Sequence, residues 1–389
     1  MTYRIKTLNA ISPVGLAELP KESYEVGTDV APADALLLRS ANLHGVAIPA
    51  SVKAVARAGA GTNNIPIADY SARGIPVFNT PGANANAVKE LVIAAFYLAA
   101  RNIVPAAVFA HDLEGTAEEM DKAVEAGKKA FVGFELPGRV LGVIGLGAVG
   151  VLVANAATAL GMRVIGYDPA ITVEHAWNLS AKVERVTDLG ALLRESDLVT
   201  LHVPLIPATR GLIGAEQLAQ LRAGAVLVNF ARGPIVDEAA LVEALDAGHL
   251  GSYVSDFPSP ALNQRVGTVM LPHLGASTNE AEDNCARMAA EQLRAFLEDG
   301  TITNSVNFPN AVLGRNPDTS RLVIANSNVP NMVGQISTVL AGAGLNISDL
   351  LNKSRGELAL TLVDVQGAVP EGLLGQILSI PGVLSARVI

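Results

Sequence analysis

The chain has 389 residues, half of them hydrophobic and 4% aromatic, with a formal net charge of −9. This length is more than one hydrophobic core normally serves and predicts two or three domains. The negative charge argues against nucleic acid as a partner. The longest apolar run, 91–100, is about half the length of a membrane-spanning helix, so we expect no membrane partner. No signal-peptide pattern opens the chain, and the single cysteine permits no internal disulfide, so we expect a cytoplasmic protein.

Up to about residue 298, short apolar runs alternate with helical patterns. Runs bounded by Gly, Pro or Asn predict parallel strands at 35–38, 52–58 and 76–78, and a long helix follows at about 87–102. A second series predicts buried strands at 140–144, 163–167, 198–203, 225–230, 252–256 and 268–271, and helices at 149–160, 215–221, 238–247 and 280–298. Such alternation predicts doubly wound parallel sheets with helices on both faces, an α/β fold.

The last 80 residues show a different order of elements. Residues 308–318 contain two prolines and little periodicity, which is typical of a linker. Beyond it, strands and helices are expected in the order βαββαβ, at 321–325, 331–343, 347–353, 358–364, 371–379 and 384–389. This order predicts a small C-terminal domain of the ferredoxin-like type.

A GxGxxG motif is formed by Gly145, Gly147 and Gly150 between a predicted buried strand and a predicted helix. Asp168 ends the next strand, at the distance where dinucleotide-binding proteins place a ribose-binding acid. The helix N-terminus would offer free N–H groups to a pyrophosphate. A carboxylate at Asp168 would repel a 2′-phosphate, so the motif predicts NAD as the cofactor and disfavours NADP.

Two charged side chains follow other predicted strands. Arg232 comes just after 225–230, and His273 just after 268–271. Ligands of open α/β sheets bind at this carboxyl edge, and arginine can grip a carboxylate with two charged hydrogen bonds. From position alone, a structural ion pair for Arg232 and a strand-capping role for His273 remain equally open. The histidines have no metal-ligand spacing, so we expect no metal site.

Several motifs resemble the D-2-hydroxyacid dehydrogenase family: GLGAVG, LHVPLIPATRGLI, NFARGPIVDE and PHLGAST, together with ARAGAGTNNI and ARGIPVFNTPGANANAVKE near the N-terminus. The resemblance implies two Rossmann-like doubly wound parallel-sheet domains. The substrate-binding domain would comprise 1–95 and 284–308, and the NAD-binding domain 96–283. A linker at 309–319 would lead to 320–389, which resembles an ACT domain.

The resemblance also implies an activity and the residues that carry it. The family transfers a hydride between NAD and a D-2-hydroxy acid, and the ACT-like tail resembles the members that act on a phosphorylated substrate, 3-phospho-D-glycerate. His273 would be the general acid/base. Arg232 would bind the substrate, as would Arg57, Arg73, Gly82, Ala83 and Asn84. NAD would be bound by Gly145, Gly147, Ala148, Val149, Gly150, Asp168, Val203, Pro204, Thr209, Phe230, Ala231, Asp256, His273 and Gly275.

One position departs from the family pattern. Members normally have a glutamate five or six residues after the aspartate that corresponds to Asp256, and this glutamate pairs with the catalytic histidine. Here residues 257–262 contain no acid. We therefore expect no carboxylate from this segment beside His273. The departure leaves a catalytically quiet NAD-sensing protein as an alternative. Glyoxylate, hydroxypyruvate and lactate are alternative substrates of an enzyme.

The ACT-like segment carries two asparagines where such domains bind an amino-acid effector. Asn328 and Asn346 match the positions that hold L-serine across a pair of domains, whereas Asn326 and Asn331 replace a usual histidine and glycine. The alternative is that these asparagines cap turns. The resemblance predicts a regulatory domain that binds L-serine, and a homodimer or homotetramer.

Overall fold

The computed structural model describes residues 2–389. The chain divides into two compact units: one runs up to Asn84 and resumes over Asn279–Ile389, and the other is Ala85–Thr278. Among the described residues, no single helix is long and apolar enough to cross a membrane. The units are described separately below.

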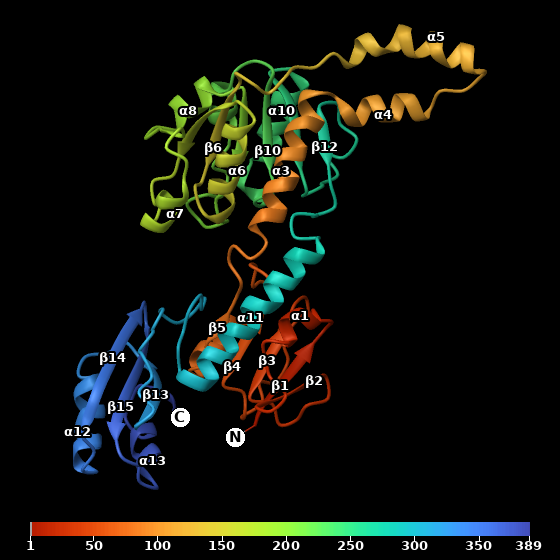
Figure 1. Ribbon diagram of the computed structural model, residues 1–389. Coiled ribbons are helices and arrows are strands. Elements are labelled where there is room, and N and C mark those ends of the chain that lie inside the picture. The colour runs from red at the N-terminus through yellow and green to blue at the C-terminus, as the bar shows by residue number, and fades with distance from the viewer. Residues whose placement is uncertain (1) are drawn as a thin grey trace. The chain divides into compact units, whose positions relative to one another are not determined.

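The middle unit is built on a seven-stranded parallel sheet in the order β12-β11-β10-β9-β6-β7-β8 (Figure 1). The central strands are buried on both faces, as all-apolar runs in a parallel sheet should be. The strands are β6 (Val140–Ile144), β7 (Arg163–Tyr167), β8 (Glu184–Arg185), β9 (Leu198–Leu201), β10 (Ala225–Asn229), β11 (Leu250–Ser255) and β12 (Thr268–Met270). The six strands expected here are confirmed, and β8 is additional.

Helices cover both faces of this sheet. One face packs against α3 (Ala85–Ala100) and α6 (Ala148–Ala159). The other packs against α8 (Leu189–Glu195), α9 (Ala215–Gln220) and α10 (Glu238–Asp246), while α7 (Val173–Asn178) follows β7. The structure thus has the doubly wound arrangement that the sequence predicts.

An arm that the sequence did not reveal leaves this unit after α3. It consists of α4 (Ile103–His111), α5 (Ala117–Gly127) and the short 3-10 helix η1 (Lys128–Phe131), and it extends away from the sheet in Figure 1. A capping box formed by Thr116 and Glu119 begins α5. No residue of α4 or α5 is buried.

The first part of the other unit is a five-stranded parallel sheet in the order β2-β1-β3-β4-β5. Its strands are β1 (Tyr3–Leu8), β2 (Tyr24–Gly27), β3 (Ala35–Leu38), β4 (Ala54–Arg57) and β5 (Val77–Phe78). The long helix α11 (Asn279–Asp299) packs on this sheet together with α1 (Pro13–Leu16). Helix α2 (Ile67–Ala72) packs on it in a second core through Tyr70. The expected strands β3, β4 and β5 are confirmed; β1 and β2 were missed.

The last part of this unit is a four-stranded antiparallel sheet in the order β14-β15-β13-β16. The elements are β13 (Thr319–Ser327), α12 (Met332–Gly342), β14 (Ile347–Arg355), β15 (Leu358–Gln366), α13 (Leu373–Leu378) and β16 (Val383–Val388). This confirms the predicted βαββαβ order. Helices α12 and α13 cover one face of the sheet, around Ile336 and Ile377.

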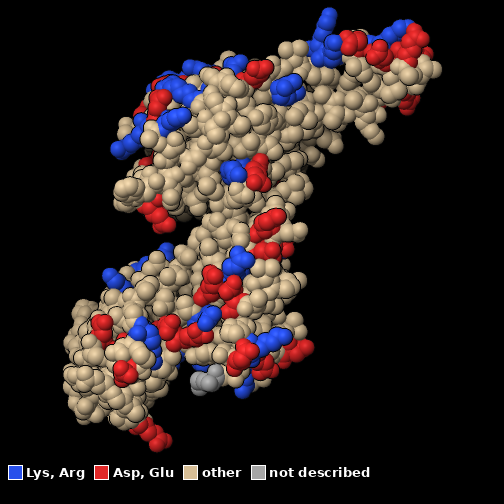
Figure 2. Space-filling model, viewed as in Figure 1, with Lys and Arg blue, Asp and Glu red and all other residues tan. Residues whose placement is uncertain are grey.

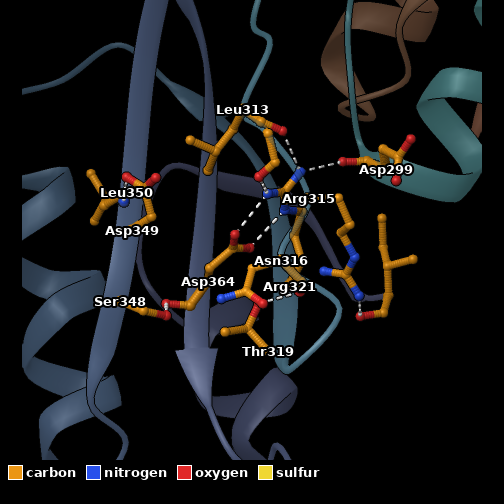
Figure 3. A network of polar contacts seen from close by, with 12 residues as sticks. Asp299, Leu313, Arg315, Asn316, Thr319, Arg321, Ser348, Asp349, Leu350 and Asp364 are labelled. Carbon is orange, nitrogen blue, oxygen red and sulfur yellow. Dashed lines mark hydrogen bonds and ion pairs between the residues drawn. The ribbon is translucent and has the colours of Figure 1, made fainter.

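The other face of the antiparallel sheet packs on the five-stranded part. Val323 and Leu362 belong to the same core as Phe296 of α11. Beside this core, the fully buried Arg321 donates to both carboxylate oxygens of Asp364, at 2.6 and 2.7 Å (Figure 3). Its remaining N–H groups donate to the carbonyls of Asp299, Leu313 and Gly314, at 2.7–3.1 Å. All five guanidinium donors are therefore used, and they tie β13 and β15 to the end of α11 and to the linker.

The units meet at residues 84/85 and 278/279, earlier in the chain than the boundaries expected at 95/96 and 283/284. The expected boundaries cut through α3 and α11. The structure keeps α3 whole because Val88, Val92 and Phe96 pack in the core of the middle unit. It keeps α11 whole because Cys285 and Leu293 pack on the five-stranded sheet.

Candidate active site

The GxGxxG loop lies between β6 and α6, as expected. Gly145 has φ +91°, and a Cβ there would lie 2.7 Å from the carbonyl oxygen of His202. A Cβ on Gly150 would lie 1.9 Å from the carbonyl oxygen of Gly145. Gly147 differs, because among the described residues no atom outside its chain neighbours lies within 4 Å of the position that its Cβ would take. The backbone at Gly147, just before the N-terminus of α6, is thus open to a pyrophosphate.

Asp168, which follows β7, is fixed over this loop. One carboxylate oxygen accepts a hydrogen bond from the backbone N–H of Leu146 at 2.8 Å, and the other accepts from Ala170 at 2.8 Å. These bonds fix the orientation of the carboxylate at the carboxyl end of β7. In folds of this kind, an acid at this strand end binds a ribose of the dinucleotide. The residues present therefore fit the adenosine half of NAD.

His202 borders the same loop from the end of β9. Its Nε2 lies 3.0 Å from the hydroxyl oxygen of Thr200. Burial lowers the pKa of the imidazole to about 3, so the ring is neutral at pH 7. Sequence reasoning did not single out His202, since it stands at no metal-ligand spacing.

Arg232, Asp256 and His273 follow β10, β11 and β12, three neighbouring strands of one sheet. The turn that carries Arg232 is fixed by Asn229, whose side-chain amide donates to the Arg232 carbonyl oxygen at 3.0 Å and whose side-chain oxygen accepts from Ala231 N at 3.1 Å. Sequence reasoning missed Asn229; its signal is a polar residue that ends an otherwise apolar buried strand.

Asp256 is the buried member of this group, with an exposed fraction of 1%. Its Oδ2 accepts from the backbone N–H of Gly275 at 3.4 Å, while Oδ1 has no hydrogen-bond partner among the described residues. Burial raises the pKa of the carboxyl, and the nearby His273 and Arg232 side chains oppose that rise. A buried oxygen without a donor fits a ligand amide, such as the carboxamide of a nicotinamide.

His273 is exposed within its own unit and has a left-handed backbone, φ +47°. Its backbone N–H donates to the Asp256 carbonyl at 3.1 Å, and its ring packs against Phe257 with centroids 5.0 Å apart. Within residues 85–278 the ring has no hydrogen-bonded carboxylate. A left-handed backbone is uncommon at a residue other than glycine, and such conformations are frequent at functional sites.

The carboxyl edge of the five-stranded sheet carries Arg57 at the end of β4, with the loop 79–84 after β5 beside it. Asn79 donates its side-chain amide to the Ala60 carbonyl at 2.6 Å, and the backbone N–H of the buried Thr80 donates to Gly59 at 3.2 Å. Gly82, Ala83 and Asn84 lie in the turn that leads into α3.

Arg73 does not join Arg57. It precedes β5, and its guanidinium donates to the carbonyls of Ile48 and Pro49 near the start of β4. Because β4 and β5 are parallel, Arg73 lies at the amino edge of the sheet and Arg57 at the carboxyl edge. The expectation that both arginines bind the substrate is therefore corrected: Arg73 is on the wrong edge.

The two asparagines of the C-terminal sheet also lie far apart. Asn328 follows β13 and donates to the Gly356 carbonyl at 3.0 Å, beside the β14–β15 turn. Asn346 precedes β14, and its carbonyl accepts from Gln366 at the opposite end of β15. A cavity of about 390 Å³ is lined by Ser337, Thr338 and Asn346 among others.

Comparison with known proteins places this geometry in context. Residues 108–275 match the model of the D-isomer specific 2-hydroxyacid dehydrogenase NAD-binding domain. The chain is 36% identical to D-3-phosphoglycerate dehydrogenase of Methanocaldococcus jannaschii over 96% of this chain and 70% of that protein. It is 34% identical to the enzyme of the same name from Haemophilus influenzae, over 85% and 79%.

Among solved structures, the fold is similar to NAD+-bound 3-phosphoglycerate dehydrogenase of Entamoeba histolytica. The TM-score is 0.61 at 28% identity, and the match covers 79% of this chain and 99% of that one.

Proposed function

The chain belongs to the family of D-isomer-specific 2-hydroxyacid dehydrogenases, and we propose that it oxidises 3-phospho-D-glycerate to 3-phosphooxypyruvate with NAD, in the synthesis of L-serine. The observation that carries the proposal is the strand-end group of Arg232, Asp256 and His273, beside a dinucleotide loop with an open approach at Gly147. The relatives named D-3-phosphoglycerate dehydrogenase, which align with most of this chain, favour the phosphorylated substrate.

Each residue of the group has one role in this reaction. NAD would supply the hydride acceptor for the carbon that bears the substrate hydroxyl. His273 takes the hydroxyl proton as general base, and Arg232 holds the carboxylate and the oxygen that becomes the carbonyl. Asp256 offers Oδ1 to the nicotinamide carboxamide. The backbone amides of Gly82, Ala83 and Asn84 bind the acid group of the substrate, and Arg57 binds the phosphate of the substrate.

NAD is held by the loop and by the strand ends around it. Gly145, Gly147 and Gly150, with Ala148 and Val149 at the start of α6, take the pyrophosphate, and Asp168 takes the ribose. The remaining contacts are Val203, Pro204 and Thr209 after β9, Phe230 and Ala231 after β10, and His273 and Gly275 after β12. Because the Asp168 carboxylate would repel a 2′-phosphate, catalytic efficiency with NADP should be far lower than with NAD.

A panel assay tests the reaction class. NADH formation is followed with 3-phosphoglycerate, D-glycerate, glycolate and D-lactate at equal concentrations, and phosphoglycerate should give the highest kcat/KM. The second candidate is a quiet NAD-sensing protein, which the lack of an acid at residues 257–262 favours. It predicts tight NADH binding, measured by fluorescence, with no turnover of any substrate.

We propose that the C-terminal domain is an ACT-type regulatory module that binds L-serine between two copies. One copy cannot bring Asn328 and Asn346 to one ligand, because they lie at opposite ends of the sheet. A two-fold related copy would place Asn346 of one chain against Asn328 of the other. Calorimetry should show serine binding that Asn346→Ala abolishes, whereas Gln366→Ala, an exposed neighbour, should bind as wild type. Equal binding by both variants would remove this role.

The protein should form a homodimer or homotetramer, and the arm supplies one contact. Ile103, Val104 and Val108 are 42%, 38% and 54% exposed, although they are apolar. Figure 2 shows the charged side chains of the arm gathered towards α5, which leaves α4 largely uncharged. A second copy would bury the α4 face. Val108→Asp should lower the mass measured by sedimentation, whereas Val124→Asp on α5 should change it less.

A further inference from the structure

A cavity of about 530 Å³ lies where the antiparallel sheet packs on the five-stranded part, within one compact unit. One wall comes from residues 50–53 and 72–75, at the amino edge of β4 and β5. The opposite wall comes from β16 and from side chains of β13 and β15. The volume is in the range of small-molecule sites. The cavity opens at the edge opposite to Arg57, so it is separate from the substrate edge.

The walls combine positive charge with apolar surface. Lys53, Arg73 and Arg387 all line the cavity, and no aspartate or glutamate does among the described residues. Lys53 pairs with Asp34 behind the wall, at 2.7 Å. The cavity therefore keeps an excess of two positive charges. Phe296, Leu360 and Leu384 supply apolar surface.

Arg387 has an unusual environment for a cation. Its Nη groups donate to the carbonyls of Phe296 and Leu297 at the end of α11, and its guanidinium carbon lies 4.7 Å from the centre of the Phe296 ring. Its buried Nε has no hydrogen-bond partner among the described residues, and no carboxylate forms an ion pair with it there. Burial lowers the pKa of Arg387 to about 10, which still leaves it charged at pH 7. A largely desolvated guanidinium that forms no ion pair among the described residues attracts an anion.

We propose that this cavity is a binding site for a small organic anion with a carboxylate or phosphate head and an apolar body. The head would lie among Arg73, Arg387 and Lys53, and the body against Phe296, Leu360 and Leu384. In this site Arg73 would bind the anion. Its position at the amino edge of the sheet excludes it from binding the substrate. Since the walls come from both sheets, an occupant would hold the C-terminal sheet on the five-stranded part.

The probe for the test is 1-anilinonaphthalene-8-sulfonate, an apolar aromatic anion, added to the full chain with saturating NAD. The fluorescence titration is repeated with two cavity variants. Ala50→Trp fills the mouth from an exposed position, and Arg73→Gln removes one charge. The matched controls are Ala47→Trp and Arg185→Gln, both exposed and outside the cavity lining. Melting temperatures establish that each variant is folded.

We expect each cavity variant to weaken the probe at least tenfold, and the controls to bind it as wild type does. Octanoate should displace the probe at lower concentration than 1-octanol or inorganic phosphate, because neither an alkyl tail nor a negative charge is sufficient alone. Displacement by hexyl phosphate shows whether a phosphate head is preferred to a carboxylate. The KM for phosphoglycerate should not change in Arg73→Gln. Equal probe binding by wild type and both cavity variants, or equal displacement by octanoate and octanol, would overturn the proposal.

Discussion

Two buried charged groups in this molecule differ in how fully their hydrogen-bonding capacity is used. Arg321 and Asp364, in the C-terminal sheet, satisfy each other and three backbone carbonyls, so that no donor of the guanidinium is left over. Asp256, at the strand ends of the middle unit, is equally buried but keeps one oxygen without a partner. The first group contributes to the fold alone. The second keeps unused hydrogen-bonding capacity, which is what a ligand site requires.

The largest effect is expected at the histidine beside Asp256. His273→Ala removes the proton acceptor and should lower turnover by roughly 10²–10⁴. NADH binding, measured by fluorescence, should change much less than turnover, because the dinucleotide loop is untouched and only one of the cofactor contacts is lost. Phe257→Leu is a useful control, since it removes the ring contact and leaves the base. Near-full turnover in His273→Ala would refute its role as general base.

The structural pair should show its effect in stability instead. Arg321→Met leaves the Asp364 carboxylate buried without a partner, and the free energy of unfolding should fall by about 3–5 kcal/mol. The double variant Arg321→Met/Asp364→Leu removes both charges and should recover part of that loss in urea unfolding. Equal stability of wild type and the single variant would show that the network contributes nothing.

Replacing each aspartate by asparagine compares the two groups directly. Burial raises the pKa of Asp256, so its contribution to stability is present below the usual aspartate range and is lost as the pH rises through the raised value. The ionised form of Asp256 therefore costs stability, and Asp256→Asn should unfold at the same or higher urea concentration than wild type while it loses activity. Asp364→Asn should unfold earlier and keep its activity if folded. A loss of stability in both would break the comparison.

A smaller effect is expected from His202. Because its pKa is lowered from the ordinary value to about 3, the neutral ring stabilises the fold fully above about pH 6.5. That contribution is lost as the pH falls towards 3, by at most about 1.4 kcal/mol per pH unit for one proton. Urea unfolding at pH 7 and pH 5 should differ less in His202→Gln than in wild type. An equal difference in both would mean that the buried ring does not resist protonation.

The sequence predicted the middle unit well because its signals are local. Strand, glycine loop, helix and acid follow one another within 140–168, and each of Arg232 and His273 comes directly after an apolar run. The arm and the strands β1 and β2 were missed for an equally physical reason. In Tyr3–Leu8, Arg4 and Lys6 interrupt the apolar residues, and α4 is apolar on nearly all sides, so it has no polar face to give it a helical period.

The prediction from sequence placed Arg73 at the substrate, although the order of residues and strands already argued against that position. Arg57 lies at the end of a strand and Arg73 precedes the next one, so in a parallel sheet they belong to opposite edges. The packing of the antiparallel sheet on the five-stranded part could not be predicted from the sequence in this way. It depends on the Arg321 donors that reach Asp299, Leu313 and Gly314, and nothing in the spacing of these residues indicates which carbonyls a buried arginine will meet.

The most direct test of the proposed activity compares two substrates and two proteins. kcat/KM is measured with NAD for 3-phosphoglycerate and for D-glycerate, in wild type and in Arg57→Ala. If Arg57 binds the phosphate, its loss should lower kcat/KM for phosphoglycerate by about 1.5–3 kcal/mol, roughly 10- to 150-fold, and leave D-glycerate nearly unchanged. Equal kcat/KM for the two substrates in wild type, or an equal fall for both in the variant, would contradict a phosphoglycerate dehydrogenase.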